Sequence, residues 1–182
     1  MEYGPRALGA RSIIADPRSP EMQKKLNLDI KFRESFRPFA PAMLPEEAER
    51  LFDLGNESPY MLLVDTIKEE HRKELPGNYM ELPMMEKLYH LRSNLPAATH
   101  VDFSARVQTV HEETNSKFHL LLTKFKEQTG VGVLLNTSFN VRGEPIVCTL
   151  QDGYDCFMHT GLDYLVAGNY IFKKDKGQKT KD

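Results

Sequence analysis

The chain has 182 residues, 40% of them hydrophobic, which suffices for one domain to bury about two-thirds of its unfolded surface in a single core. Its 24 lysines and arginines nearly balance its 26 acidic residues, and this argues against a surface built to neutralise a nucleic-acid backbone. No apolar run reaches the roughly 20 residues that span a bilayer and no signal segment is visible, so we expect a cytoplasmic protein.

The first elements alternate between strand and helix. Residues 11–16 form a short apolar run closed by Asp-Pro, which favours a strand. Ser19 and Pro20 supply an N-cap and a first-turn proline for a helix that ends near residue 28. Residues 39–44 predict another strand, and the proline within it predicts a sheet edge or a bulge.

The middle of the chain is less regular. Residues 45–52 open with a proline and acids and predict a short helix, and residues 60–64 predict a buried strand. Between residues 68 and 95 the pattern loosens around one possible helix at 84–91, so we expect an insertion or a lid there. Residues 103–110 alternate between apolar and polar as a strand does.

The C-terminal part has the clearest signals. A helix over residues 116–128 is predicted by apolar side chains at helical spacing, namely Phe118, Leu121, Leu122 and Phe125. Residues 131–135 form a continuous apolar strand that meets a polar run at 136–140. Thr149 opens a capping box for a helix to residue 159, and residues 165–172 would complete the sheet.

This alternation predicts an α/β domain of the mixed α+β kind over residues 1–174, with one twisted mixed sheet flanked by helices. The polar tail 175–182 has almost nothing to bury and is expected to be disordered. Cys148 and Cys156 have no second pair beside them, which indicates buried free thiols in place of a disulfide framework or a zinc site.

Three polar clusters stand out from this scaffold. The loop at residues 3–12 carries Arg6 and Arg11 on a glycine- and proline-rich backbone that could present cations to an anion, although an ordinary turn has the same composition. Residues 31–39, if extended, would place Lys31, Arg33 and Arg37 on one face and anchor Phe32 and Phe36 on the other. The alternative there is a solvated charged face.

The third cluster combines residues 99–109 with the amides and hydroxyls of residues 136–140. Polar groups at the end of a buried strand lie where open α/β sheets bind ligands, although a Ser/Thr or Asx turn could use some of them. The six histidines never show the i, i+4 spacing of a helical metal site, so no metal-binding residue is predicted. No Gly-x-Ser-x-Gly elbow is present, which argues against nucleophilic hydrolysis.

These clusters resemble a known family. Five blocks occur in the same order as in the C-terminal domain of the nodulation-protein-U, cephamycin and tobramycin O-carbamoyltransferases: Glu2–Gly9, Lys31–Pro41, His100–Asp102, Arg106–Val110 and Asn136–Asn140. The resemblance covers most of the chain. It implies a YrdC-like domain that takes carbamoyl phosphate and ATP, with Mg²⁺ accompanying the ATP, and forms carbamoyl-adenylate.

The resemblance also implies a partner and a set of site residues. An N-terminal, actin-like, metal-binding domain would pass the carbamoyl group to a hydroxyl acceptor, and this chain resembles only the other part. By resemblance, Lys31 and Arg106 are the catalytic cations, while Arg6, Arg37, Asn136 and Ser138 bind carbamoyl phosphate and ATP. Phe103 departs from the family pattern, which has glycine after Asp102.

Two other functions compete with this interpretation. A YrdC-like domain could instead make threonylcarbamoyl-adenylate for tRNA modification, but the Lys-x-Arg-x3-Arg-Pro-Phe-Ala-Pro block is typical of the O-carbamoyl branch and the chain is not basic. A non-catalytic nucleotide- or anion-binding module is the third hypothesis, for which the departure at Phe103 leaves room.

Overall fold

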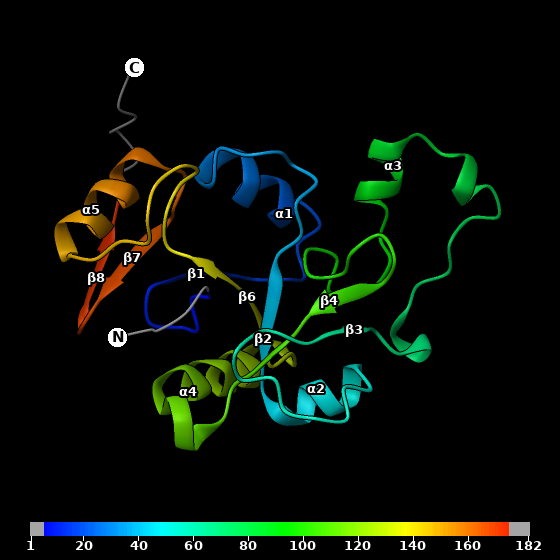
Figure 1. Ribbon diagram of the computed structural model, residues 1–182, viewed down its shortest axis with the longest axis horizontal. Helices are drawn as coiled ribbons and strands as arrows, with labels where there is room; N and C mark the ends of the chain where they lie inside the picture. Colours follow the sequence, from blue (N-terminus) through cyan, green and yellow to red (C-terminus); the bar gives the residue numbers. More distant parts are fainter. Residues whose placement is uncertain (1–5, 175–182) are drawn as a thin grey trace.

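Four strands form the central sheet of the computed structural model, which describes residues 6–174. They lie in the order β1 (Ser12–Ala15), β6 (Val133–Ser138), β2 (Ala40–Met43) and β5 (Gln108–Thr109). Figure 1 labels the first three of these strands near the middle of the molecule. β6 pairs antiparallel with β1 and β2, whereas β2 pairs parallel with β5. The mixed sheet with helices around it confirms the predicted mixed α+β class.

The two faces of β6 bury different cores because side chains alternate along a strand. Val133 and Leu135 belong to the larger core, together with Met43 and Ile13. Leu134 points the other way, into a smaller core under α4 (Glu112–Thr129). Asn136 and Ser138 follow Leu134 in the same alternation, so their side chains lie on the α4 side of the sheet.

β2 corrects the expectation of an edge strand. It lies between β6 and β5 and is buried along its whole length. Pro41 is tolerated because β5 pairs only with Ala42 and Met43. No backbone carbonyl of β5 lies opposite Pro41 to accept a hydrogen bond from the N–H that proline lacks. At Pro41, β2 therefore pairs with β6 only, although β2 as a whole lies inside the sheet.

Four helices agree with the sequence in outline. α2 (Pro45–Leu51), α3 (Met84–Tyr89) and α5 (Leu150–His159) form where predicted, and both hydrogen bonds of the Thr149–Asp152 capping box are present. α4 begins four residues earlier than expected, through a kink at Asn115. Gly130 ends it in the left-handed conformation.

The first helix differs more. α1 (Met22–Lys25) begins after Glu21, without a side-chain cap from Ser19, and continues as a π-helix, η1 (Leu26–Ile30). The helical segment therefore ends beyond residue 28 and delivers Lys31 directly at its C-terminal end. π-helical turns are rare and are frequently found at functional sites.

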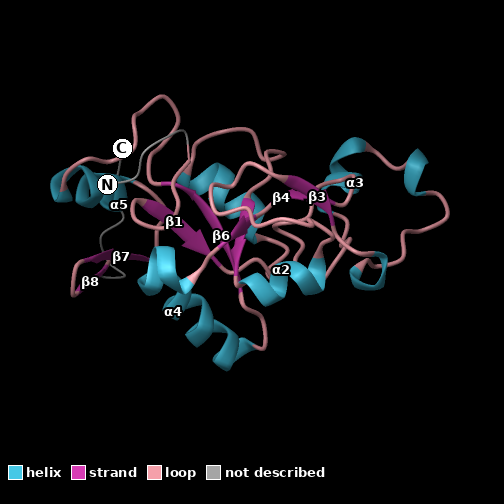
Figure 2. Ribbon diagram, turned by 60° about the horizontal axis from the view of Figure 1, so that its bottom comes forward, coloured by secondary structure: helices cyan, strands magenta, loops and turns pink. Residues whose placement is uncertain are grey.

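A long excursion separates β2 from β5 along the chain. It contains β3 (Val64–Thr66), the 3-10 helices η2 (Glu69–His71) and η3 (Tyr79–Glu81), α3 and β4 (Ser104–Arg106), and it extends from the molecule on the side away from α5 (Figure 1, Figure 2). The predicted buried strand at 60–64 is wrong, because Tyr60, Leu62 and Val64 are exposed and only the last belongs to a strand. Whether this excursion acts as a lid stays a prediction.

The last two strands also differ from the expectation. β7 (Tyr164–Ala167) and β8 (Tyr170–Lys173) pair only with each other and pack on α5, so they form a hairpin apart from the central sheet. Both cysteines are free, but only Cys156 is buried, whereas Cys148 is exposed. The tail 175–182 and residues 1–5 lie outside the described residues.

Candidate functional site

The N-terminal loop is held on the α4 side of the sheet by three side-chain amides. Asn136 Nδ2 donates to the carbonyl of Ala7 at 3.0 Å, and Gln108 Nε2 and Asn115 Nδ2 both donate to the carbonyl of Leu8 at 3.2 Å. Asn136 Nδ2 also donates to Gln108 Oε1 at 2.7 Å, which joins β6 to β5 across β2. These bonds fix the backbone immediately after Arg6.

Arg6 and Arg106 are brought together by this arrangement although they are far apart in the sequence. The pKa of Arg106 is lowered, first by burial and then by the like charge of Arg6. Both Nε atoms are buried and have no hydrogen-bond partner among the described residues. Two neighbouring guanidinium groups with like charge and buried, unpaired Nε donors among residues 6–174 are suited to binding an anion.

The alternation of side chains places Arg106 on one side of the sheet. Ala105 and Val107 point into the larger core, so Arg106 and Gln108 point to the opposite side of the chain. Gln108 bonds Asn136 on that side. Arg106, Gln108 and Asn136 therefore belong to one continuous polar surface, whose centre is buried: Gln108 and Asn136 are 2% and 1% exposed.

Lys31 forms a second centre at the end of β6. Its Nζ donates to Ser138 Oγ at 3.2 Å, to Asn140 Oδ1 at 2.7 Å and to the backbone carbonyls of both residues. Burial, followed by the charge of Arg33, lowers the pKa of Lys31 to about 8. A pKa of about 8 lies above neutral pH, so Lys31 is mainly cationic there, and the surrounding oxygens accept its protons.

The cations that follow Lys31 are not arranged as an extended strand. Arg33 Nε donates to Asn27 Oδ1 at 2.7 Å, and its guanidinium lies 4.9 Å from the ring centroid of Phe39. Arg37 forms an ion pair with Glu34 at 3.1 Å, and Arg142 reaches the same carboxylate at 3.4 Å. The predicted division into a cationic face and a buried aromatic face is wrong, because the loop coils and leaves the aromatic rings of Phe32 and Phe36 exposed.

The two centres meet along β6. Asn136 holds the loop of Arg6, and Ser138 contacts Lys31 two residues further on the same face, which places these anchors about 7 Å apart. The structure thus gathers five of the predicted residues along this polar surface: Arg6, Lys31, Arg106, Asn136 and Ser138. Arg37 lies in the outer loop, and its ion pair is with Glu34.

Sequence reasoning missed several members of this surface. Asn140 accepts from Lys31 and from Ser138 Oγ, and Gln108 connects Asn136 to the N-terminal loop. Both residues lie in blocks that the sequence singled out, and the period of two from Arg106 and Ser138 would have found them. Arg142 comes from the loop after β6, where no pattern marked it.

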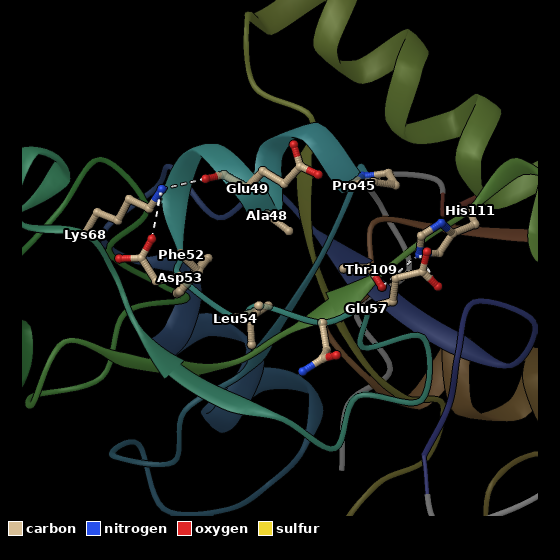
Figure 3. A pocket seen from close by; sticks show the side chains of 12 residues that line it. Pro45, Ala48, Glu49, Phe52, Asp53, Leu54, Glu57, Lys68, Thr109 and His111 are labelled. Carbon is tan, nitrogen blue, oxygen red and sulfur yellow. Dashed lines mark hydrogen bonds and ion pairs between the residues drawn. The ribbon is translucent and has the colours of Figure 1, made fainter.

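A cavity of about 620 Å³ opens elsewhere, between α2, the loop at 53–57 and the end of β5. Figure 3 shows Lys68 at one end, where it contacts Asp53 and the carbonyl of Glu49, and His111 at the other. None of the cations of the polar surface lines this cavity. We place the candidate site at the polar surface because, among residues 6–174, it and not the cavity holds buried donors without hydrogen-bond partners.

Other classes of site find no support in the part of the chain that the structure describes. Within it, no group of three or more histidine, cysteine or acidic side chains is placed to hold a metal ion. Across residues 6–174 there is also no helix both long and apolar enough to cross a membrane.

Comparison with known proteins identifies the family. Residues 1–174 match the family described as Carbamoyltransferase C-terminus. An uncharacterized protein of Synechocystis is 58% identical over 96% of this chain and 28% of its own length. Nodulation protein NolO of Bradyrhizobium diazoefficiens is 41% identical over 95% of this chain, and 3'-hydroxymethylcephem-O-carbamoyltransferase of Amycolatopsis lactamdurans is 36% identical over 97%. The chain spans less than a third of each of these relatives. It belongs to the carbamoyltransferase C-terminal family.

Proposed function

We propose that this chain binds carbamoyl phosphate and ATP and forms carbamoyl-adenylate, as the YrdC-like part of an ATP-dependent O-carbamoyltransferase. The observation that carries the proposal is the neighbouring pair of Arg6 and Arg106, whose buried Nε donors have no hydrogen-bond partner among residues 6–174. Lys31 adds a third cation along the same strand. Two anionic substrates need such a concentration of fixed positive charge in order to lie side by side.

The chemistry requires no nucleophile from the protein. Water would release phosphate from carbamoyl phosphate and leave carbamate, whose oxygen attacks the α-phosphorus of ATP. The bond from that phosphorus to the β-phosphate oxygen breaks, and pyrophosphate leaves with the electron pair. Negative charge grows on the oxygens around the α-phosphorus, and the guanidinium groups of Arg6 and Arg106 would stabilise it where it develops.

Lys31 has a distinct role in this scheme. Four oxygen acceptors compete for its three protons, so a phosphate oxygen can replace one of them without leaving Nζ short of partners. Ser138 and Asn140 then hold the ammonium in place while it contacts the substrate. Arg37 would meet a phosphate only by exchanging its pairing with Glu34, at the outer rim of the site.

Mg²⁺ would enter with ATP. Phosphate oxygens and water would hold the ion, as is usual for Mg²⁺ that accompanies a nucleotide. The ion would neutralise part of the triphosphate charge. The side chains of the polar surface would orient the remaining oxygens.

A second domain completes the proposed reaction. The relatives are more than three times as long as the region they share with this chain, and one of them is named as a carbamoyltransferase that acts on a hydroxymethyl group. An N-terminal domain would receive carbamoyl-adenylate and transfer the carbamoyl group to a hydroxyl acceptor. Isolated from that domain, the chain should bind both substrates but adenylate poorly if the other domain closes the pocket.

Calorimetry with ATP and with carbamoyl phosphate tests the proposal directly. A folded sample that binds neither compound would reject it. Pyrophosphate release is then measured with the chain combined with the preceding part of the Synechocystis relative. Release that depends on carbamoyl phosphate and ignores threonine supports the proposal, whereas release that requires threonine and bicarbonate would assign the chain to threonylcarbamoyl-adenylate synthesis.

A further inference from the structure

The loop at residues 32–38 is held by side-chain amides of the helix that precedes it. Asn27 Nδ2 donates to the carbonyls of Ser35 and Arg37 at 3.1 and 2.9 Å. Gln23 Nε2 donates to the carbonyls of Phe36 and Arg37 at 3.4 and 3.3 Å. Both amides are buried, at 0% and 6% exposure, so these bonds are shielded from water and fix the backbone of the loop.

Two aromatic rings nevertheless stand out from this loop. Phe32 and Phe36 are 50% and 58% exposed, although phenylalanine is ordinarily buried. Phe32 follows the C-cap of η1 and has a φ of 48°, the left-handed conformation that commonly ends a helix but that bulky residues adopt only with strain. A fixed loop that holds two rings in solvent, one of them in a strained conformation, is preorganised to contact something flat and apolar.

The surroundings of the rings specify the charge of that ligand. Lys31, Arg33, Arg37 and Arg142 lie around the loop, with Glu34 as the acid between the last two. Arg33 already stacks on Phe39, so it leaves Phe32 and Phe36 uncovered. The ligand that fits has an aromatic face next to several negative charges, which describes a nucleoside triphosphate.

We propose that Phe32 and Phe36 form a stacking platform for the nucleobase of ATP, whose phosphates lie on the neighbouring cations. This rests on the proposed function, because it places the base of a nucleotide that the chain is proposed to bind. Stacking on aromatic rings tolerates any base, so the platform selects for a nucleotide over a free polyphosphate without selecting adenine.

Titration calorimetry with two ligands isolates the platform. ATP and inorganic tripolyphosphate, each with Mg²⁺, carry similar charge, but only ATP has a base. In Phe36→Ala, ATP should bind about tenfold more weakly, while the affinity for tripolyphosphate stays within about twofold. Phe32→Asn should behave alike and still fold, because asparagine tolerates the left-handed conformation.

Two matched variants complete the design. Phe36→Tyr keeps a stacking face and should retain the affinity for ATP. Tyr60→Ala removes an exposed ring elsewhere, 65% exposed, and should change neither affinity.

The possible results distinguish a failure of the proposed function from a failure of the stacking platform alone. Wild-type protein that binds neither ligand overturns the proposed function and the platform with it. Wild-type protein that binds both, with unchanged ATP affinity in Phe36→Ala and Phe32→Asn, overturns the platform alone and leaves the rings as a surface for another protein. Parallel loss of both ligands in these variants also overturns it, because the rings would then support the cations and not the base.

Discussion

Replacement of Arg106 by methionine separates a ligand-binding arginine from a structural one. In the free chain its buried Nε has no hydrogen-bond partner within the described part of the chain, and its charge lies beside that of Arg6. A buried donor without a partner costs about 1–3 kcal/mol, reduced here because the side chain is partly exposed and solvent screens the pair. Methionine keeps the apolar stem. We therefore expect the free energy of unfolding of Arg106→Met to stay level or to rise by about 1 kcal/mol.

The stabilisation by a bound anion, in contrast, should be smaller in Arg106→Met than in the wild-type chain. At a concentration of 100 Kd, an anion such as tripolyphosphate stabilises the wild-type chain by about 2.7 kcal/mol. Loss of a charged hydrogen bond of about 1.5–3 kcal/mol raises Kd roughly 10- to 150-fold. At the same ligand concentration the stabilisation of Arg106→Met then falls to about 0.3–1.3 kcal/mol.

Urea denaturation with and without tripolyphosphate measures both quantities, provided that the slope of the transition stays constant. Arg92→Met is the matched control. Arg92 is 2% exposed and donates to four backbone carbonyls, those of Lys87, Leu88, Thr99 and His100, so its loss should destabilise the free chain by about 3 kcal/mol or more. If Arg106→Met were instead clearly destabilised and still responded to ligand as the wild type does, Arg106 would be a structural residue and the site assignment would be wrong.

Three further predictions concern other parts of the molecule. Affinity for tripolyphosphate should fall as the pH rises through about 8, because Lys31 loses its charge there, and Lys31→Met should lack this component in a calorimetric pH series. Asn136→Ala frees the carbonyl of Ala7 and should lower both the free energy of unfolding, by about 1–3 kcal/mol, and the affinity for the anion; unchanged affinity would show that the loop needs no anchor. Gly130→Ala meets no atom within 4 Å but adopts a φ of 77°, so urea denaturation should show a loss of about 1 kcal/mol from backbone strain alone.

The elements that sequence patterns predicted well are those whose signals are local. The capping box at Thr149, the glycine that ends α4 and the proline that begins α2 each act within one turn of a helix, and each is present in the structure. Local signals did not determine where strands ended. β6 continues through Asn136 to Ser138 because its backbone pairs there with β1, and the polar side chains of Asn136 and Ser138 find partners in Gln108 and Lys31. No local pattern reveals these distant partners.

The same limit explains the loop after Lys31. Its alternating letters predicted an extended segment with buried phenylalanines, whereas the amides of Gln23 and Asn27 coil the backbone and turn the rings outward. Those amides come from the preceding helix, and nothing in their own pattern marks them as buried. The candidate site residues were predicted from the sequence blocks to which they belong, whereas their arrangement relative to one another became visible only in the fold.

The turn before Arg106 shows how an unusual residue can be accommodated. Phe103 has a φ of 65°, a conformation in which glycine is free of strain, and this explains why glycine is the expected residue. Its ring is packed against the larger core and covered by the guanidinium of Arg72, at 4.9 Å from the centroid. These contacts offset a strain on the order of 1–3 kcal/mol.

The remaining bonds of that turn are intact despite the phenylalanine. Asp102 accepts from the N–H and the hydroxyl of Ser104, and Arg92 holds the carbonyl of His100 from the buried side. β4 therefore leaves the turn in register with β3 and carries Arg106 to its place beside Arg6. Because the backbone adopts the conformation that glycine would allow, the departure at Phe103 is compensated where it occurs, and it gives no reason to prefer a non-catalytic module over a working adenylation site.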